Sequence, residues 1–388
     1  MKICLPVLAA ALPIGATTAA AAEPELRVVE HLVVYEDPIF YAAFPSIVRR
    51  PDGELLVAFR RAPDRRRFGE PVSHVDANSQ LVLVRSKDAG RTWTKEPRLI
   101  HAHPFGGSQD PCMVQLRDGT IVCTSYAWAP LRAATFDKLP KPVAREQDFC
   151  FLGGYLVRSA DGGNTWQSPV TPPPCKGEAQ HDLFGNPVPA YNRGAMCEGT
   201  DGNLYWVVAS NDAGSSRRTA THLLVSADKG QTWQYSAVVA RDEKAGFNEA
   251  SILQTPKGDL VAFLRTENFD DHTAIARSTD GGKTFKWQDA GFKGHPHHAV
   301  RLPDNRVLLV YGYRHAPYGV RARVLNAECT DAGSATETVL RDDGGNGDLG
   351  YPWATALPDG KALVVYYFNR ADGTRHIAGT VLKIEAGQ

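Results

Sequence analysis

Ser86-Lys87-Asp88-Ala89-Gly90-Arg91-Thr92-Trp93 is an octet whose pattern, S-x-D-x-G-x-T-W, recurs along the chain. Further copies lie at residues 159–166, 226–233 and 278–285, the last with Phe in place of Trp. In such an octet the aspartate can accept N–H bonds within a tight turn, and the glycine permits the reversal. The aromatic residue can fill the space between neighbouring sheets. The four copies therefore predict a repeated β-sheet unit.

A second repeated signal is a turn pair followed by an apolar run. The pairs, mostly Asp-Gly, lie at residues 52–53, 118–119, 201–202, 257–258, 304–305 and 359–360. Such a pair between apolar runs predicts a hairpin. Spacings of 66, 83, 56, 47 and 55 residues fit propeller blades of roughly 40–50 residues with insertions in the first two intervals.

These signals predict an all-β chain, a six-bladed β-propeller of four-stranded antiparallel sheets. Residues 32–35 are expected to complete the last sheet and close the ring, and residues 326–334 are interpreted as a decayed octet. Six cysteines lie beyond residue 22, and the sequence leaves disulfides and buried free thiols equally open.

Composition and the start of the chain limit where the protein works. Lys2, the apolar stretch after it and the small residues 20–22 predict a signal peptide over residues 1–22, leaving one propeller domain over 23–388. We therefore expect a periplasmic or secreted protein with no membrane insertion. Lys plus Arg equals Asp plus Glu, 43 each, which argues against a nucleic-acid partner. No cofactor and no metal site are predicted, since no CxxC pair or trusted ligand spacing occurs.

The octets resemble the Asp-boxes, or BNR repeats, of the sialidase-like superfamily, and the resemblance covers about residues 30–385. In that family the octets are structural, and the inner strands of the propeller begin at the mouth of a central channel. Here those strands are expected to begin near residues 44–45, 110–111, 194, 248–249, 297–298 and 351–352. The resemblance implies a glycan substrate and an exo-acting glycoside hydrolase that retains configuration.

The resemblance also assigns a catalytic pair. Tyr351 matches the tyrosine nucleophile, and Glu249 matches the glutamate that takes its proton. A neutral phenol suits this chemistry, because an anionic nucleophile would be repelled by a sugar carboxylate at the reacting carbon. Asp76, on the loop after the first unit's second strand, is our candidate for the general acid, and Asp110 is a candidate substrate contact.

Arginines are the expected clamp for a carboxylate, because the guanidinium fork binds it through two hydrogen bonds. Arg265 matches a family arginine, and Arg60, Arg314 and Arg321 also lie at or beyond strand ends. His298, in the cluster at residues 295–298, is a further candidate substrate contact.

One departure from the family pattern keeps two alternatives open. Sialidases usually carry R-I-P at the first inner strand, whereas this chain has Ala43-Phe44-Pro45. A related acidic sugar, or a uronate-directed lyase or rhamnosidase-type propeller using the histidines and Tyr351, therefore remains open. A non-catalytic carbohydrate-binding propeller is the third alternative.

Overall fold

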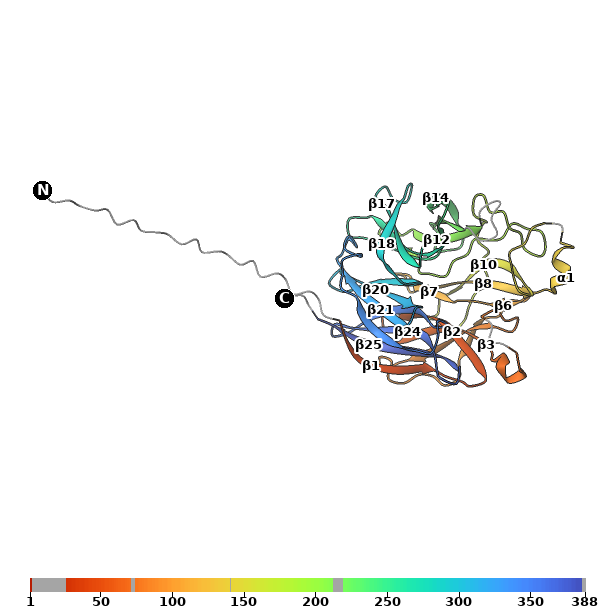
Figure 1. Cartoon of the computed structure of the whole chain (residues 1–388), viewed down its shortest axis with the longest axis horizontal. Helices are drawn as coiled ribbons and strands as arrows, with labels where there is room; N and C mark the ends of the chain where they lie inside the picture. The colour runs from red at the N-terminus through yellow and green to blue at the C-terminus, as the bar shows by residue number, and fades with distance from the viewer. Residues whose placement is uncertain (2–25, 71–73, 140, 212–218, 386–388) are drawn as a thin grey trace.

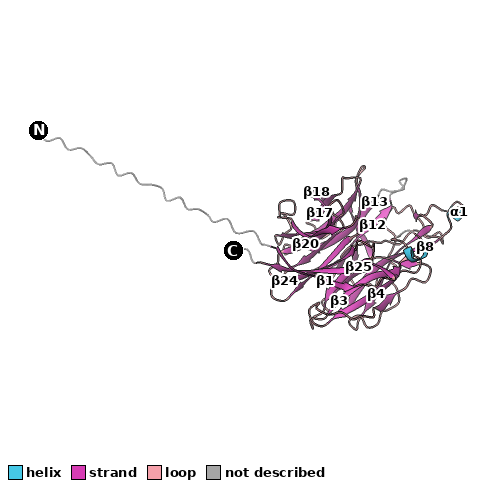
Figure 2. Ribbon diagram, turned by 60° about the horizontal axis from the view of Figure 1, so that its bottom comes forward, coloured by secondary structure: helices cyan, strands magenta, loops and turns pink. Residues whose placement is uncertain are grey.

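The computed structural model describes Met1 and residues 26–70, 74–139, 141–211 and 219–385. The chain forms six antiparallel sheets whose inner strands contact one another around one axis, which confirms the predicted six-bladed β-propeller. Figure 2 shows that strands make up nearly all of the regular structure, and Figure 1 shows β1 (Leu26–Tyr35) beside β25 (Arg375–Ile384). Apart from Met1, the predicted signal peptide falls outside the described residues. Within the described ranges, no helix has both the length and the apolar character needed to cross a membrane.

Four blades use four strands that follow one another along the chain. Blade 1 contains β2 (Phe40–Arg49), β3 (Leu55–Pro63), β4 (Gln80–Ser86) and β5 (Arg98–His101). Blade 3 contains β11 (Cys197–Glu198), β12 (Leu204–Asn211), β13 (Thr219–Ser226) and β14 (Gln234–Ala240). Blade 4 contains β15 (Gly246–Gln254), β16 (Leu260–Glu267), β17 (His272–Ser278) and β18 (Lys286–Lys293). Blade 5 contains β19 (His297–Arg301), β20 (Val307–Tyr313), β21 (Tyr318–Leu325) and β22 (Thr338–Gly344).

Blade 2 departs from the regular pattern, because its inner strand is broken into two segments that both pair with β8. Its strands are β6 (Gly107–Ser108), β7 (Cys112–Gln115), β8 (Ile121–Pro130), β9 (Arg145–Glu146) and β10 (Phe149–Ser159). The described residues also form two short helices, η1 (Arg65–Phe68) between β3 and β4 of blade 1 and α1 (Ala133–Phe136) between β8 and β9 of blade 2. The break in the inner strand falls at Asp110, one of the predicted site residues.

Blade 6 closes the ring with strands from both ends of the chain. It contains β23 (Gly350–Leu357), β24 (Lys361–Asn369), β25 (Arg375–Ile384) and the N-terminal β1 (Leu26–Tyr35). β1 pairs antiparallel with β25 as the outer strand. The expectation that residues 32–35 complete the last sheet is therefore confirmed.

The octets form the turns that the sequence predicts. In the first copy, Asp88 Oδ1 accepts from the Thr92 amide (2.9 Å), and Asp88 Oδ2 accepts from the Thr92 hydroxyl (2.5 Å). These bonds lower the pKa of Asp88 to about 2. The same bonds recur in the other three copies. In the predicted decayed copy, Asn326 closes a turn through Thr330 instead.

The hydrophobic core consists of six clusters, each between two adjacent blades. The octet aromatic of each of the first four blades packs between its own blade and the preceding one; these residues are Trp93, Trp166, Trp233 and Phe285. Burial of apolar surface between blades therefore holds the ring together. The six cysteines beyond residue 22 are all free thiols, and only Cys197 among them is not buried, which decides between the two possibilities left open above.

Candidate active site

Backbone bulges at three inner strands direct side chains toward the axis. Phe44, Glu249 and Tyr351 are non-glycine residues with positive φ, at 57°, 29° and 52°. The pairing register of each strand shifts at the same point, on β2, β15 and β23. Bulges of this kind re-aim side chains, and positive φ at such residues stores backbone strain that is common at functional sites. Two of the three are the predicted catalytic pair.

Tyr351, Glu249 and Arg265 form one hydrogen-bonded group. The Tyr351 hydroxyl donates to Glu249 Oε1 at 2.8 Å. Arg265 Nη1 donates to Glu249 Oε2 at 2.6 Å and to the Tyr351 hydroxyl oxygen at 3.2 Å. Glu249 and Arg265 lie across the β15–β16 pair, and Tyr351 reaches them from blade 6. The structure thus brings together three predicted site residues that are up to 102 positions apart.

The charges of this group favour an ionised carboxylate beside a neutral phenol. Burial disfavours the charged form of Glu249, but Arg265 and the Tyr351 hydroxyl outweigh burial, so the pKa of Glu249 lies below its ordinary value. Burial raises the pKa of Tyr351, and the charge of Glu249 reinforces this, while Arg265 and Arg314 act in the opposite direction. The neutral phenol therefore lies within hydrogen-bond reach of a carboxylate that is able to accept its proton.

Arg193 belongs to the same site and was missed by the sequence analysis. Its guanidinium carbon lies 5.2 Å from the centre of the Tyr351 ring and 5.0 Å from that of Trp353. Arg193 Nη2 donates to the carbonyls of Pro45 (3.1 Å) and Tyr351 (3.0 Å). Arg193 therefore links blades 1 and 6 beneath the tyrosine.

The neighbour of Arg193 explains its position. A Cβ on Gly194 would lie 1.9 Å from the carbonyl oxygen of Ala250, so only glycine permits this close approach to β15. Asn192 fixes the same segment, because its amide donates to the Ala250 carbonyl at 2.7 Å. The sequence predicts that an inner strand begins near residue 194. An arginine directly before such a position was the sequence signal that could have identified Arg193 as a site residue.

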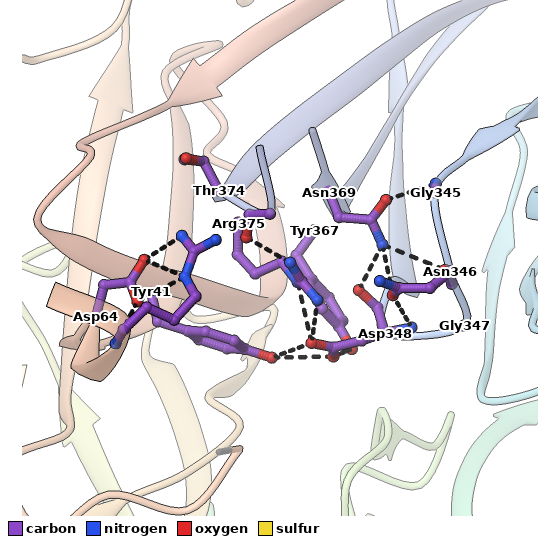
Figure 3. A network of polar contacts seen from close by, with 12 residues as sticks. Tyr41, Asp64, Gly345, Asn346, Gly347, Asp348, Tyr367, Asn369, Thr374 and Arg375 are labelled. Carbon is purple, nitrogen blue, oxygen red and sulfur yellow. Dashed lines mark hydrogen bonds and ion pairs between the residues drawn. The ribbon is translucent and has the colours of Figure 1, made fainter. Parts of the chain in front are cut away.

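A polar network holds the segment that leads into Tyr351. Figure 3 shows Tyr41, Tyr367 and Arg375 directed at the carboxylate of Asp348. The two hydroxyls donate at 3.0 and 2.9 Å, and Arg375 Nη2 lies at 2.9 Å. These bonds connect the segment before β23 to β2, β24 and β25. They place Tyr351 through its backbone, without touching its hydroxyl.

Arg314, another predicted site residue, lies beside this segment. Its Nε donates to the Gly347 carbonyl at 2.6 Å, and its guanidinium carbon lies 5.9 Å from the centre of the Tyr351 ring. The structure therefore brings Arg314 to the tyrosine. Its bond to Gly347 uses Nε and neither of the two Nη atoms.

Asp110 and Arg60 are buried charged residues near this group. Burial raises the pKa of Asp110 to about 6, opposed by Arg193 and reinforced by Glu249. The Tyr126 hydroxyl donates to Asp110 Oδ2 at 3.1 Å. Arg60 is fully buried, and its guanidinium carbon lies 5.3 Å from the centre of the Tyr41 ring. None of its three side-chain nitrogens has a hydrogen-bond partner among the described residues.

The remaining predicted residues have other contacts. Asp76 is buried, and its carboxylate accepts from Arg65 Nε (2.5 Å) and from the Asn78 amide (2.7 Å). Arg321 lies on β21, the third strand of blade 5, where it donates to the Arg341 carbonyl at 2.6 Å. The structure therefore does not bring the Arg321 guanidinium to the Tyr351 group, and its bonds instead join β21 to β22.

His298 likewise makes contacts between blades. Its ring stacks on Trp353 with centroids 4.2 Å apart, and its Nδ1 accepts from the Ala354 amide at 3.1 Å. Burial lowers the pKa of His298 well below its ordinary value. Across the described ranges of the chain, no group of three His, Cys, Asp or Glu side chains is placed to hold a metal ion.

Comparisons with known proteins agree with this architecture. A family model for the BNR repeat-like domain matches residues 144–364. A sialidase of Micromonospora viridifaciens is 24% identical over 356 residues, which are 83% of this chain and 49% of that protein. The chain thus spans about half the length of this curated relative.

Solved structures show the same fold. A protein of unknown function from Dyadobacter fermentans is 58% identical, with a TM-score of 0.91 over 93% of this chain and 99% of that chain. The Penicillium chrysogenum alpha-L-arabinanase, solved with arabinobiose, is 13% identical, with a TM-score of 0.63 over 92% of this chain and 98% of that chain. The four octets, the six blades and the family match give one conclusion: the chain belongs to the BNR repeat-like domain family of sialidase-like β-propellers.

Proposed function

We propose that the protein is an exo-acting glycoside hydrolase that releases a terminal acidic sugar from a glycan with retention of configuration. The observation that carries the proposal is the bond from the Tyr351 hydroxyl to Glu249, with Arg265 bridging both side chains. In the first step Tyr351 Oη attacks the anomeric carbon as its proton passes to Glu249, and the glycosidic oxygen leaves with a proton from an acid. Water then cleaves the tyrosyl–sugar bond, as in retaining enzymes generally.

The positively charged hydrogen-bond donors around Tyr351 favour an acidic sugar as the substrate. Arg193, Arg265 and Arg314 carry positive charge close to its ring or hydroxyl. Two nitrogens of Arg193 and Nε of Arg265 are buried and lack partners among the described residues. Guanidinium groups bind carboxylates in strong charge-assisted bonds, so a sugar carboxylate would satisfy donors of this kind. The relation to the Micromonospora viridifaciens sialidase supports the same class of substrate.

Asp110 is better suited than Asp76 to supply the proton. A pKa of about 6 keeps a large share of Asp110 protonated at mildly acidic pH. Both carboxylate oxygens of Asp76 already accept hydrogen bonds, one of them from Arg65. We therefore propose Asp110 as the general acid, and comparison of Asp110→Asn with Asp76→Asn distinguishes the two.

The experiment is a substrate panel containing the 4-methylumbelliferyl glycosides of sialic acid and glucuronic acid, sialosides and uronate-containing oligosaccharides. We expect release of a free acidic sugar whose first-formed anomer, followed by NMR, has the configuration of the substrate. An unsaturated uronate product would support the lyase alternative instead. Glycan binding without turnover on the whole panel would support the non-catalytic alternative and contradict the hydrolase.

A further inference from the structure

A pocket lies on blade 2, and its lining residues include none of the Tyr351 group. Its volume is about 460 Å³, and it is formed by β10 together with the segments around residues 103–105 and 171–189. This volume lies within the range of roughly 300–1,000 Å³ that is usual for small-ligand pockets. The second segment is part of the long insertion between the second and third turn pairs, and long ordered insertions in compact domains are usually functional.

Prolines and close backbone packing form the wall of the pocket. Four prolines contribute to its wall, at positions 172, 174, 187 and 189. At its base, a Cβ on Gly153 would lie 2.5 Å from the Pro189 ring, and one on Gly154 would lie 2.0 Å from the Ala190 carbonyl oxygen. The insertion therefore packs directly on the β10 backbone. A preformed site of this kind loses little conformational entropy on binding.

Two exposed aromatic rings form one side of the pocket. Phe105 is 60% exposed and Phe184 is 58% exposed, and their rings meet edge to face with centroids 5.3 Å apart. Phe184 is held by the Asp182 carboxylate, which accepts from the amides of Phe184 and Asn186 at 2.9 Å each. An exposed pair of large apolar rings beside a preformed hollow indicates a binding surface.

The lining suits an uncharged ligand with hydroxyl groups. The described residues that line the pocket include no lysine or arginine, and burial lowers the pKa of His103 to about 4, so its ring is neutral. Asp182 is the one carboxylate among them, and its Oδ1 already accepts from the amides of Phe184 and Asn186. Thr171 and Asn186 add neutral polar groups beside the phenylalanines. Aromatic rings flanked by hydrogen-bonding groups, with no cation to bind an acidic sugar, match the two surfaces of a neutral pyranose, its apolar C–H face and its hydroxyl rim.

The register of blade 2 places this pocket on the same face of the propeller as Tyr351. β6 pairs with the end of β8, at Gly107 and Trp128, and the end of β8 pairs with the first half of β10, which forms the pocket. The Tyr155 hydroxyl donates to Ser108 Oγ at 2.7 Å, two residues before Asp110. A glycan chain leaving the central site over blade 2 would therefore meet the two phenylalanines.

We infer that this pocket is a subsite for neutral pyranose units of the glycan, away from the acidic sugar that is cleaved. The inference rests on the proposed function for the direction of the chain, although binding at the pocket does not require cleavage. It assigns the substrate as an oligosaccharide with an acidic end and a neutral continuation, rather than a small acidic glycoside.

The test measures binding of neutral tetrasaccharides, cellotetraose and β-1,4-galactotetraose, to the full protein by calorimetry and saturation-transfer NMR. We expect at least one of the two to bind. The double variant Phe105→Ala/Phe184→Ala should bind it at least about tenfold more weakly, because two ring contacts are lost. Phe68→Ala is the matched control, because Phe68 is 76% exposed on η1 and lies outside the pocket. This variant should bind the tetrasaccharide with the affinity of the wild type. Unchanged melting temperatures establish that the variants fold.

Three results would overturn the inference: no binding of either tetrasaccharide to the wild type, equal affinity in the double variant, or a change of oligomeric mass in the double variant without loss of binding. The last result would assign the phenylalanines to a contact between two copies of the chain. Binding that depends on both rings, together with a protein inactive on every acidic glycan, would support the subsite and refute the hydrolase, so the two proposals fail separately.

Discussion

Replacing Glu249 with glutamine separates the charge of this side chain from its shape. Glutamine keeps an oxygen near the Tyr351 hydroxyl but cannot take its proton, and it leaves Arg265 without its closest anion. Loss of a general base typically costs 10²–10⁴-fold in rate. We therefore expect kcat for release of 4-methylumbelliferone from the active acidic glycoside to fall by about that factor.

The contacts of Glu249 also determine how much Glu249→Gln destabilises the protein. Breaking a buried ion pair costs about 3–5 kcal/mol, and this pair is mostly buried, with Glu249 14% and Arg265 20% exposed. Because glutamine retains a hydrogen-bond acceptor, we expect the free energy of unfolding to fall by only about 2–3 kcal/mol. Urea denaturation followed by circular dichroism measures this value.

The pH dependence distinguishes a base from a structural residue. In the wild type the charge of Glu249 helps to raise the pKa of Tyr351. Removing that charge lowers the tyrosine pKa, so Glu249→Gln should regain part of its activity as pH rises and phenolate forms. Glu267→Gln is the matched control, because Glu267 accepts from Asn248 at 2.8 Å within the same strand pair. Wild-type kcat in Glu249→Gln, or a pH profile identical to that of the control, would show that Glu249 does not act as the base for Tyr351.

Three further variants test other parts of the site. Asp110→Asn should lose activity mainly below about pH 6, where Asp110 of the wild type is protonated. The raised pKa of Asp110 makes the wild type lose stability as pH rises between about 4 and 6. The stability of Asp110→Asn relative to the wild type should therefore be greater at pH 8 than at pH 4. Activity and melting profiles against pH measure both, and parallel wild-type and variant profiles would contradict this. Arg314→Met should raise KM for the acidic substrate about 10–100-fold with a smaller change in kcat, and an unchanged KM would remove Arg314 from the carboxylate clamp. Arg193→Met should lower the free energy of unfolding by about 2–3 kcal/mol, because two inter-blade hydrogen bonds are lost, and urea denaturation showing no change would exclude this linking role.

The architecture was predictable because its signals are local and repeated. Each octet closes its turn with its own side chains, and each turn pair marks one hairpin, so counting them gives the blades. The meeting of Tyr351 with Glu249 was predictable for a related reason. Residues that begin inner strands converge on the axis whatever their separation along the chain, which is why Tyr351 and Glu249 meet.

Whether the other predicted residues reach the site depends on the direction of their side chains, which the sequence does not specify. Arg321 lies on a third strand and bonds to β22, while His298 begins an inner strand but faces the adjacent blade. Alternate residues of a strand face opposite sides, so a shift of one position changes which side chain reaches the axis. Arg193 precedes a very short strand in an insertion, where no periodic pattern marks its position.

The proposed mechanism requires Tyr351 to form a covalent bond to an acidic sugar. The most direct measurement is peptide mass spectrometry after incubation with 2,3-difluorosialic acid and, in parallel, with 2-deoxy-2-fluoroglucuronyl fluoride. We predict that one of these reagents adds its glycosyl mass to the peptide containing Tyr351, and that Tyr351→Phe abolishes the label. A label on another residue, or release of an acidic sugar by a protein that neither reagent labels, would contradict the account.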